Sequence, residues 1–273
     1  MNSCFDKICG GNYTLYIHRN FRNDIFEQAL LDSEKKLGER YQLTAIQSSK
    51  FARVYKLTIR FNDADKGVYF KQYLYRSVWD FIKNFVRASR AERTFTASEM
   101  LSENGFDNPA IIAVGKFRYG LYHATNFLVT LAIEDAKQIC QFASDSKLGT
   151  QGRRELIRAF GLTVGQMHAK GIFHGDLRLG NILAKQEKSR WRFFFIDNER
   201  TRKFHSLPTR LRLKNLVQVN MFRTETVSNT DRMRFFREYW AQNEESGIEK
   251  TTLIKKVLEE TRRRLDKKEK RKL

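Results

Sequence analysis

Stretches rich in β-branched and aromatic residues alternate with polar turns in the first half of the chain. Residues 41–48, 52–61 and 67–75 have this character and predict strands. The polar run 62–67 predicts the turn between the last two. Strands joined in this way predict an antiparallel meander.

A helical pattern follows at residues 88–103, where an Asn-Gly pair supplies the C-terminal cap. Two further strand-like stretches come next, at 110–117 and 125–131. This region therefore predicts a small sheet accompanied by one helix.

The remainder of the chain reads as mainly helical. Apolar side chains recur at helical spacing across residues 152–170, and Gly171 ends that pattern. The other expected elements are short strands at 172–173 and 182–184, a stronger strand at 191–196, helices at 209–220 and 230–242, and a basic helix from about residue 248.

These elements predict an α+β fold of two lobes. A small antiparallel sheet with one helix would form the N-terminal lobe over residues 1–130, and a mainly helical C-terminal lobe would occupy 131–245. Residues 246–273 would form a basic helical tail. The chain has 273 residues, of which 41% are hydrophobic, and this is sufficient for the cores of both lobes.

Charge narrows the set of partners. Lys and Arg number 51 against 31 Asp and Glu, a net charge of +20, which attracts nucleic acid, anionic membranes or phosphorylated substrates. The tail from 248 to 273 carries 11 basic and 5 acidic residues, a net of +6, which fits either a solvated helix end or contact with anionic lipid headgroups.

The cellular compartment is predicted from what the sequence lacks. Three cysteines without a CxxC pair favour a reducing environment. The first residues do not form a signal peptide, and no apolar run approaches the ~18 residues that span a bilayer. We therefore expect a cytoplasmic protein.

One loop carries the strongest chemical signal, the run IFHGDLRLGNIL at residues 172–183. Asp176 lies on a tight loop between two short strands, where it can serve as the base for an acceptor hydroxyl. Asn181 follows five residues later, and Asp197 ends the next strong strand. Amide and carboxylate oxygens are ligands that Mg²⁺ accepts, so we predict Asn181 and Asp197 as metal ligands.

Two neighbours of Asp176 are assigned roles by their position. His174 is expected to pack beneath the loop and to hold it, rather than to act as a base. Arg178 lies two residues after the base and is expected to stabilise the transferring phosphate; a salt bridge within the loop is the alternative.

An Asp base, an Asn five residues later and an Asp after the next strand form the layout of a kinase catalytic site. A kinase also needs a lysine that holds the phosphates of ATP. Lys71 lies inside an apolar strand, where it requires an anionic partner. Glu92 on the following helix is the preferred carboxylate, and Glu99 is the alternative on the same helix face. The nucleotide-covering turn is expected at residues 47–54, which contain no glycine, so Ser48 and Ser49 would present their backbone amides to phosphate.

With these residues in hand, the chain resembles the lipopolysaccharide core kinases of the Kdo/WaaP family over roughly residues 50–243. The resemblance rests on the Lys71 strand, the SRAER run that opens a helix, the ENGFDNP and HGDLRLGNIL segments, FFIDNERTR, and the TDRMRFF helix. Asp197-Asn198-Glu199 stands where protein kinases have Asp-Phe-Gly.

The resemblance implies a protein-kinase-like fold, ATP and Mg²⁺ as cofactors, and the hydroxyl of a heptose or Kdo sugar as acceptor. The partner would be a lipid-linked core oligosaccharide, met at the cytoplasmic face of the inner membrane by a peripherally bound enzyme. The positive charge suits such an anionic glycolipid.

Two other functions fit the same residues. The chain could phosphorylate a protein or a small soluble alcohol, or it could be a non-catalytic kinase-like module that binds an anionic membrane or nucleic acid. The presence of Lys71, Asp176, Asn181 and Asp197 together argues against a binding module, which does not need all four, and makes nucleic acid an unfavoured partner.

Overall fold

A computed structural model describes residues 4–32, 34–61, 63–74, 88–119, 122–143, 145–188, 190–222, 227–245 and 247–270. The chain divides into two units. The N-terminal unit comprises Met1–Thr96 and Pro109–Glu134, and the C-terminal unit comprises Ala97–Asn108 and Asp135–Leu273. The first crossing between the units occurs within one helix, α4 (Arg90–Glu103), which was expected to belong to the N-terminal lobe alone.

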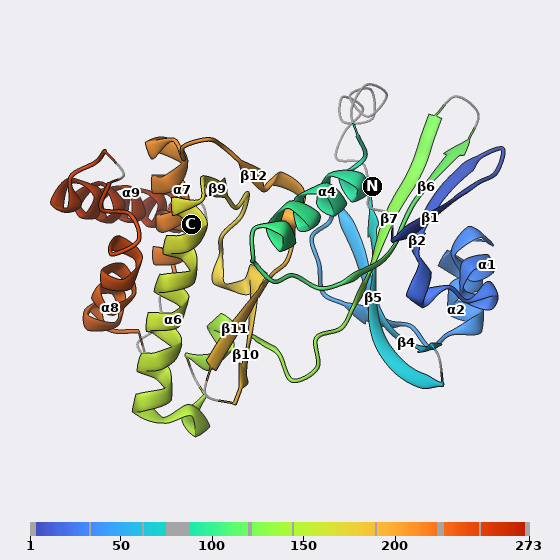
Figure 1. The fold of residues 1–273 in the computed structure, drawn as a ribbon, viewed down its shortest axis with the longest axis horizontal. Helices are drawn as coiled ribbons and strands as arrows, with labels where there is room; N and C mark the ends of the chain where they lie inside the picture. Colours follow the sequence, from blue (N-terminus) through green and yellow to red (C-terminus); the bar gives the residue numbers. More distant parts are fainter. Residues whose placement is uncertain are drawn as a thin grey trace. The chain divides into compact units, whose positions relative to one another are not determined.

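A seven-stranded antiparallel sheet forms the N-terminal unit, in the order β1-β2-β6-β7-β5-β4-β3. Figure 1 shows these strands with α1 and α2 beside β1 and β2. The strands are β1 (Phe5–Cys9), β2 (Tyr13–His18), β3 (Thr44–Ile46), β4 (Ala52–Phe61), β5 (Ala64–Tyr73), β6 (Ile111–Tyr119) and β7 (Tyr122–Leu131). The predicted meander is present, and β5 begins three residues earlier than expected because Asp63 makes the turn at φ 61°.

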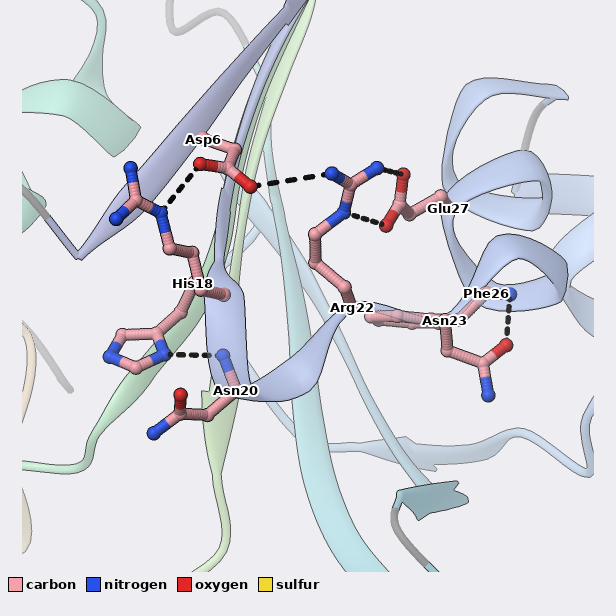
Figure 2. Close-up of polar contacts among 8 residues, drawn as sticks. Asp6, His18, Asn20, Arg22, Asn23, Phe26 and Glu27 are labelled. Atoms are coloured by element: carbon pink, nitrogen blue, oxygen red, sulfur yellow. Dashed lines mark hydrogen bonds and ion pairs between the residues drawn. The ribbon is translucent and has the colours of Figure 1, made fainter.

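The first forty residues add the strands β1 and β2 and the helices α1 and α2 to the N-terminal unit. The β1–β2 hairpin extends the sheet, because β2 pairs with β6. Arg22 ties this hairpin to α1 (Asp24–Asp32): its guanidinium bonds Asp6 of β1 at 3.3 Å and Glu27 of α1 at 2.9 Å, as Figure 2 shows. The next helix, α2 (Glu34–Arg40), completes this segment, and Leu37 is buried in the core of the unit.

The C-terminal unit is built around a long central helix, α6 (Gly149–Ala169). Its apolar face, predicted from the helical spacing, is buried at Leu156, Phe160, Val164 and Met167. The other helices are α5 (Ile139–Phe142), α7 (Thr209–Asn220), α8 (Asn229–Trp240) and α9 (Lys250–Glu269).

Short strands complete the C-terminal unit and carry the predicted loop. One antiparallel sheet has the order β11-β10-β8, and a second pairs β12 with β9. These strands are β8 (Lys137–Gln138), β9 (Ile172–Phe173), β10 (Ile182–Glu187), β11 (Arg190–Phe195) and β12 (Arg202–Lys203).

The basic C-terminal helix packs as part of the C-terminal unit. Leu253, Val257 and Leu265 of α9 are buried, whereas Leu258 is 57% exposed. Among the described helices, none has the length and apolar character to cross a membrane.

Candidate active site

The loop that carries Asp176 is closed by its own hydrogen bonds. Arg178 donates its backbone N–H to the carbonyl of Asp176 at 2.9 Å, and Asn181 donates its side-chain nitrogen to the same carbonyl at 2.9 Å. Because Asn181 uses its amide nitrogen in this way, its oxygen is the atom suited to a metal ion.

Gly175 is required by a close approach between two segments. A Cβ atom at this position would lie 2.2 Å from the Cβ of Arg200, closer than two carbons can approach. The loop of Asp176 therefore packs directly against the segment that follows Asp197, and the glycine before the predicted base has a structural reason.

Asp197 is brought to Asn181 by the pairing of β10 with β11. Ile182 lies opposite Phe195 in this register, and Ile196 donates its N–H to the carbonyl of Asn181 at 3.0 Å. Asp197 itself adopts a left-handed backbone conformation, with φ 61° and ψ 44°, which few residues other than glycine adopt. The two predicted metal ligands thus lie at the same end of one strand pair.

His174 lies beneath the loop, as expected, and is fully buried. Its Nδ1 accepts the backbone N–H of Asp176 at 3.2 Å, so its Nε2 carries the proton and donates to Oδ1 of Asn198 at 3.0 Å. Burial lowers the pKa of His174, although the carboxylates of Asp176 and Asp197 both favour its protonated form. His174 therefore holds the two acidic segments together as a neutral side chain.

Arg178 forms the salt bridge that was the alternative to its phosphate role. Its Nε donates to Oδ1 of Asp176 at 2.7 Å, and its Nη2 donates to Oδ2. This hydrogen bonding raises the pKa of Arg178 above its ordinary value. The guanidinium is nevertheless largely exposed, and its role toward a phosphate stays a prediction.

Two residues of α7 that the sequence analysis missed hold the loop from below. Asn215 accepts the N–H of His174 at 3.1 Å and donates to its carbonyl at 2.7 Å. Gln218 accepts the N–H of Leu177 at 3.2 Å and donates to Oδ1 of Asp176 at 3.2 Å. No local motif marks them; the only signal is two polar residues beside three apolar ones in the helix stretch NLVQV.

Lys71 occupies β5 of the N-terminal unit, between Val54 of β4 and Leu128 of β7. Its Nζ lies 5.2 Å from the centre of the Tyr73 ring, over which the guanidinium of Arg90 is also placed at 4.7 Å. Lys71 is half-buried in its strand, and its contact with phosphate stays a prediction.

Glu92 of α4 has a partner that the sequence analysis did not name. Its Oε1 accepts from Nζ of Lys116 on β6 at 2.8 Å, and its Oε2 accepts the N–H of Ser89 at 2.8 Å. Burial opposes ionisation, but these bonds outweigh it and lower the pKa of Glu92. The predicted pairing of Lys71 with Glu92, or with Glu99, stays a prediction.

The turn expected to cover the nucleotide connects β3 to β4. The hydroxyl of Ser48 donates to the carbonyl of Ala52 at 2.6 Å, and the hydroxyl of Ser49 accepts the N–H of Phe51 at 3.4 Å. Both serine side chains thus stabilise the turn itself. Their backbone amides remain the predicted phosphate contacts.

The donor set fits a magnesium ion that is shared with a phosphate. Asn181 and Asp197 supply hard oxygen ligands, and Mg²⁺ is commonly held by one or two carboxylates together with substrate phosphates and water. Within the described part of the chain, no three His, Cys, Asp or Glu side chains form a cluster that could hold a metal alone.

Comparison with known proteins shows what this chain is similar to. The model of the Lipopolysaccharide kinase (Kdo/WaaP) family matches residues 39–239. Two curated proteins, the 3-deoxy-D-manno-octulosonic acid kinases of Vibrio vulnificus strains YJ016 and CMCP6, are each 28% identical over 104 residues. That match covers 38% of this chain and 42% of each relative, so the chain spans less than half of their length.

A solved structure shares the fold. The structure described as WaaP in complex with acyl carrier protein matches with a TM-score of 0.61 and 19% identity, over 89% of this chain and 97% of that one. The predicted α+β, kinase-like fold is thereby confirmed.

Proposed function

The chain belongs to the lipopolysaccharide kinase (Kdo/WaaP) family, and on that premise we propose that it transfers a phosphoryl group from ATP to a sugar hydroxyl of the lipopolysaccharide inner core. The observation that carries this proposal is the meeting of Asp176, Asn181 and Asp197 on one pair of loops within the C-terminal unit. A heptose or a Kdo residue is the acceptor that we propose.

Each of the four predicted site residues in the C-terminal unit has its own role in the proposed reaction. Asp176 orients the acceptor hydroxyl and receives its proton, while Arg178 turns from Asp176 toward the charge that develops on the phosphate. Asn181 and Asp197 would hold Mg²⁺, which when bound would neutralise charge on the phosphates of ATP.

The N-terminal unit supplies the groups that bind the nucleotide. Lys71 contributes a positive charge for the phosphates, with Glu92 as the carboxylate assigned to it. Ser48 and Ser49 contribute backbone amides. A Lys71→Met variant is expected to weaken ATP binding, which equilibrium dialysis would measure.

Phosphate transfer to purified core oligosaccharide tests the main proposal. We expect the wild-type protein with Mg-ATP to label the oligosaccharide, and the Asp176→Asn variant to lose about 10³-fold or more of that activity while still binding ATP. Mass spectrometry of lipopolysaccharide from a strain that lacks the protein would then show the loss of one phosphoryl group, and fragment ions would identify the sugar. Transfer to a free sugar or a peptide alone would contradict the glycolipid acceptor.

We also propose that the enzyme works at the inner face of the inner membrane, as a peripheral protein. Helix α9 supports this location, because its solvent side is rich in Lys and Arg and exposes Leu258. Vesicles of anionic lipid should sediment the protein at low salt and release it at high salt, whereas neutral vesicles should not bind it.

A cavity in the C-terminal unit supports a second proposed function, the binding of an acyl chain. It has a volume of about 320 Å³ and is lined mainly by apolar side chains of α6, α7, α8 and α9, together with Leu179 of the Asp176 loop. A structural neighbour was solved in complex with an acyl carrier protein. A lauroyl-loaded carrier should raise the melting temperature of this protein, and a Val219→Trp variant, which fills the cavity, should not respond.

A further inference from the structure

A buried arginine of α7 makes the hydrogen bonds of its guanidinium to a tyrosine and an asparagine. Arg212 is 4% exposed, and its Nη1 donates to the hydroxyl oxygen of Tyr239 at 2.7 Å and to Oδ1 of Asn243 at 2.5 Å. Its Nε has no hydrogen-bond partner among the described residues. Burying a charge in this manner is costly, so the group calls for an explanation.

The hydroxyl of Tyr239 passes the interaction on to a histidine. Because Arg212 can only donate, the oxygen of Tyr239 accepts from it, and the hydroxyl proton points to Nδ1 of His168 at 3.0 Å. His168 is 1% exposed, and burial beside Arg212 lowers its pKa to about 3. The imidazole is therefore neutral, with its proton on Nε2.

At the other end of this series of hydrogen bonds, the loop backbone independently fixes the direction in which protons are donated. The backbone of His174 orients the amide of Asn215, because its N–H donates to Oδ1 and its carbonyl accepts from Nδ2. Oδ1 of Asn215 therefore accepts from Nε2 of His168, at 3.2 Å. The Nε2–H tautomer leaves Nδ1 of His168 to accept from the hydroxyl of Tyr239, in agreement with the direction that begins at Arg212.

The last two links reach the predicted base. Nδ2 of Asn215 donates to Oε1 of Gln218 at 2.9 Å, and Nε2 of Gln218 donates to Oδ1 of Asp176 at 3.2 Å. Every donor in the series points the same way, from a group that only donates to a carboxylate that only accepts. Hydrogen bonds aligned in this way polarise and strengthen one another.

We propose that Gln218 is a positioning residue for Asp176, and that Arg212, Tyr239, His168 and Asn215 form behind it a directional hydrogen-bond relay that fixes the carboxylate of the base. The relay rests on the proposed kinase function only for its consequence, because its direction is a property of the fold. It assigns a role to the buried charge of Arg212 at a site remote from the loop.

The direction of the relay is tested without any substrate. Nitrogen-15 NMR of histidine-labelled protein should show His168 as the neutral Nε2–H tautomer at pH 7, and a Tyr239→Phe variant should change its ring signals. The Nδ1–H tautomer or a protonated ring would overturn the relay, whether or not the protein is a kinase.

Kinetics test its consequence. Gln218→Met, which keeps the side-chain length but removes the donor, should lower kcat about 10-fold or more with the KM for ATP unchanged within about twofold. Tyr239→Phe should lower kcat by a smaller factor, and the double variant should lose no more kcat than Gln218→Met alone, because the relay is already broken at its last link. Multiplicative losses in the double variant would overturn the proposal.

A matched variant separates positioning from stability. Thr261→Val also removes one buried hydroxyl of this unit, which accepts from Asn220 at 3.0 Å but lies outside the relay. Its kcat should stay within about twofold of the wild type even where its stability falls. If the tautomer is as described and the wild-type protein transfers no phosphate, the kinase function fails while the relay stands.

Discussion

His174 donates from Nε2 to Oδ1 of Asn198 over 3.0 Å, and this bond joins the loop of Asp176 to the residue that follows Asp197. Both side chains are buried, at 0% and 2% exposed. The amide nitrogen of Asn198 donates to Oγ of Ser98 and to the carbonyl of Phe195, so both contacts fix the orientation of the amide. The predicted base and the predicted metal ligand are thereby held as one rigid piece.

Replacing Asn198 by Leu should lower the stability of the protein and also weaken its use of Mg²⁺. We expect a loss of about 2–3 kcal/mol in unfolding free energy, because His174 keeps a buried donor without an acceptor. The Mg²⁺ concentration for half-maximal turnover should rise at the same time, since Asp197 is no longer anchored. Chemical denaturation and a magnesium titration of kcat measure the two effects.

Ser98→Ala is the control for this change. It removes one partner of Asn198 but leaves the bond to His174 in place. Its stability should fall by about 1 kcal/mol, while the magnesium requirement stays constant. An equal shift of the magnesium requirement in both variants would mean that general loosening is responsible.

The bidentate contact between Arg178 and Asp176 makes opposite predictions for two roles of the arginine. If Arg178 moves to stabilise the transferring phosphate, Arg178→Gln should lower kcat about 10²-fold. If it only restrains the base, the same substitution should leave kcat unchanged or raise it. We expect the loss, with turnover of the exposed-residue control Arg190→Gln unchanged.

The sequence predicted that the residues of the loop lie close together because their spacing is local. Asp176 and Asn181 lie within one turn of the chain, and the apolar strand before Asp197 leads it back to the same place. Helix α7 was also predicted with its observed bounds, from Thr209 to Asn220, because its helical pattern is uninterrupted.

The residues that hold the loop through hydrogen bonds could not be predicted from local sequence patterns. Asn215 and Gln218 contact residues 41 positions earlier, and a polar residue inside a helix looks the same whether it faces water or a buried loop. The β1–β2 hairpin was missed for a related reason: its strands are mixed in polarity, and their place in the sheet depends on pairing with β6, about 100 residues away. Lys116, likewise, gave no sign that it pairs with Glu92.

The buried state of His168 should give stability a pH dependence of known sign. The pKa in the folded protein is lowered to about 3, whereas the unfolded chain takes up a proton below about 6.5. The contribution of the neutral ring is complete above pH 6.5 and is lost as pH falls toward 3, at about 1.4 kcal/mol per pH unit.

Urea unfolding between pH 7 and pH 4 measures this slope. In a His168→Gln variant, whose amide does not titrate, the slope of unfolding free energy against pH should be smaller than in the wild type by about 1.4 kcal/mol per pH unit. His205→Gln, at an exposed position, should retain the wild-type slope. Identical slopes for wild type and His168→Gln would contradict a buried neutral histidine.

The bond between Glu92 and Lys116 decides how the first turn of α4 is fixed to β6, and a double-mutant cycle measures it. Both side chains are about four-fifths buried, so we expect Glu92→Gln and Lys116→Met to couple by about 1 kcal/mol in unfolding free energy. The lowered pKa of Glu92 means that this stabilisation is present above pH 4.5 and is lost as pH falls through the pKa of the folded protein.

A cycle of Glu92 with Lys71 tests the pairing that was predicted from the sequence. If Lys71 acts on ATP affinity through Glu92, Glu92→Gln should weaken ATP binding in the Lys116→Met background as well. If Glu99 is the partner of Lys71, only Glu99→Gln should weaken ATP binding.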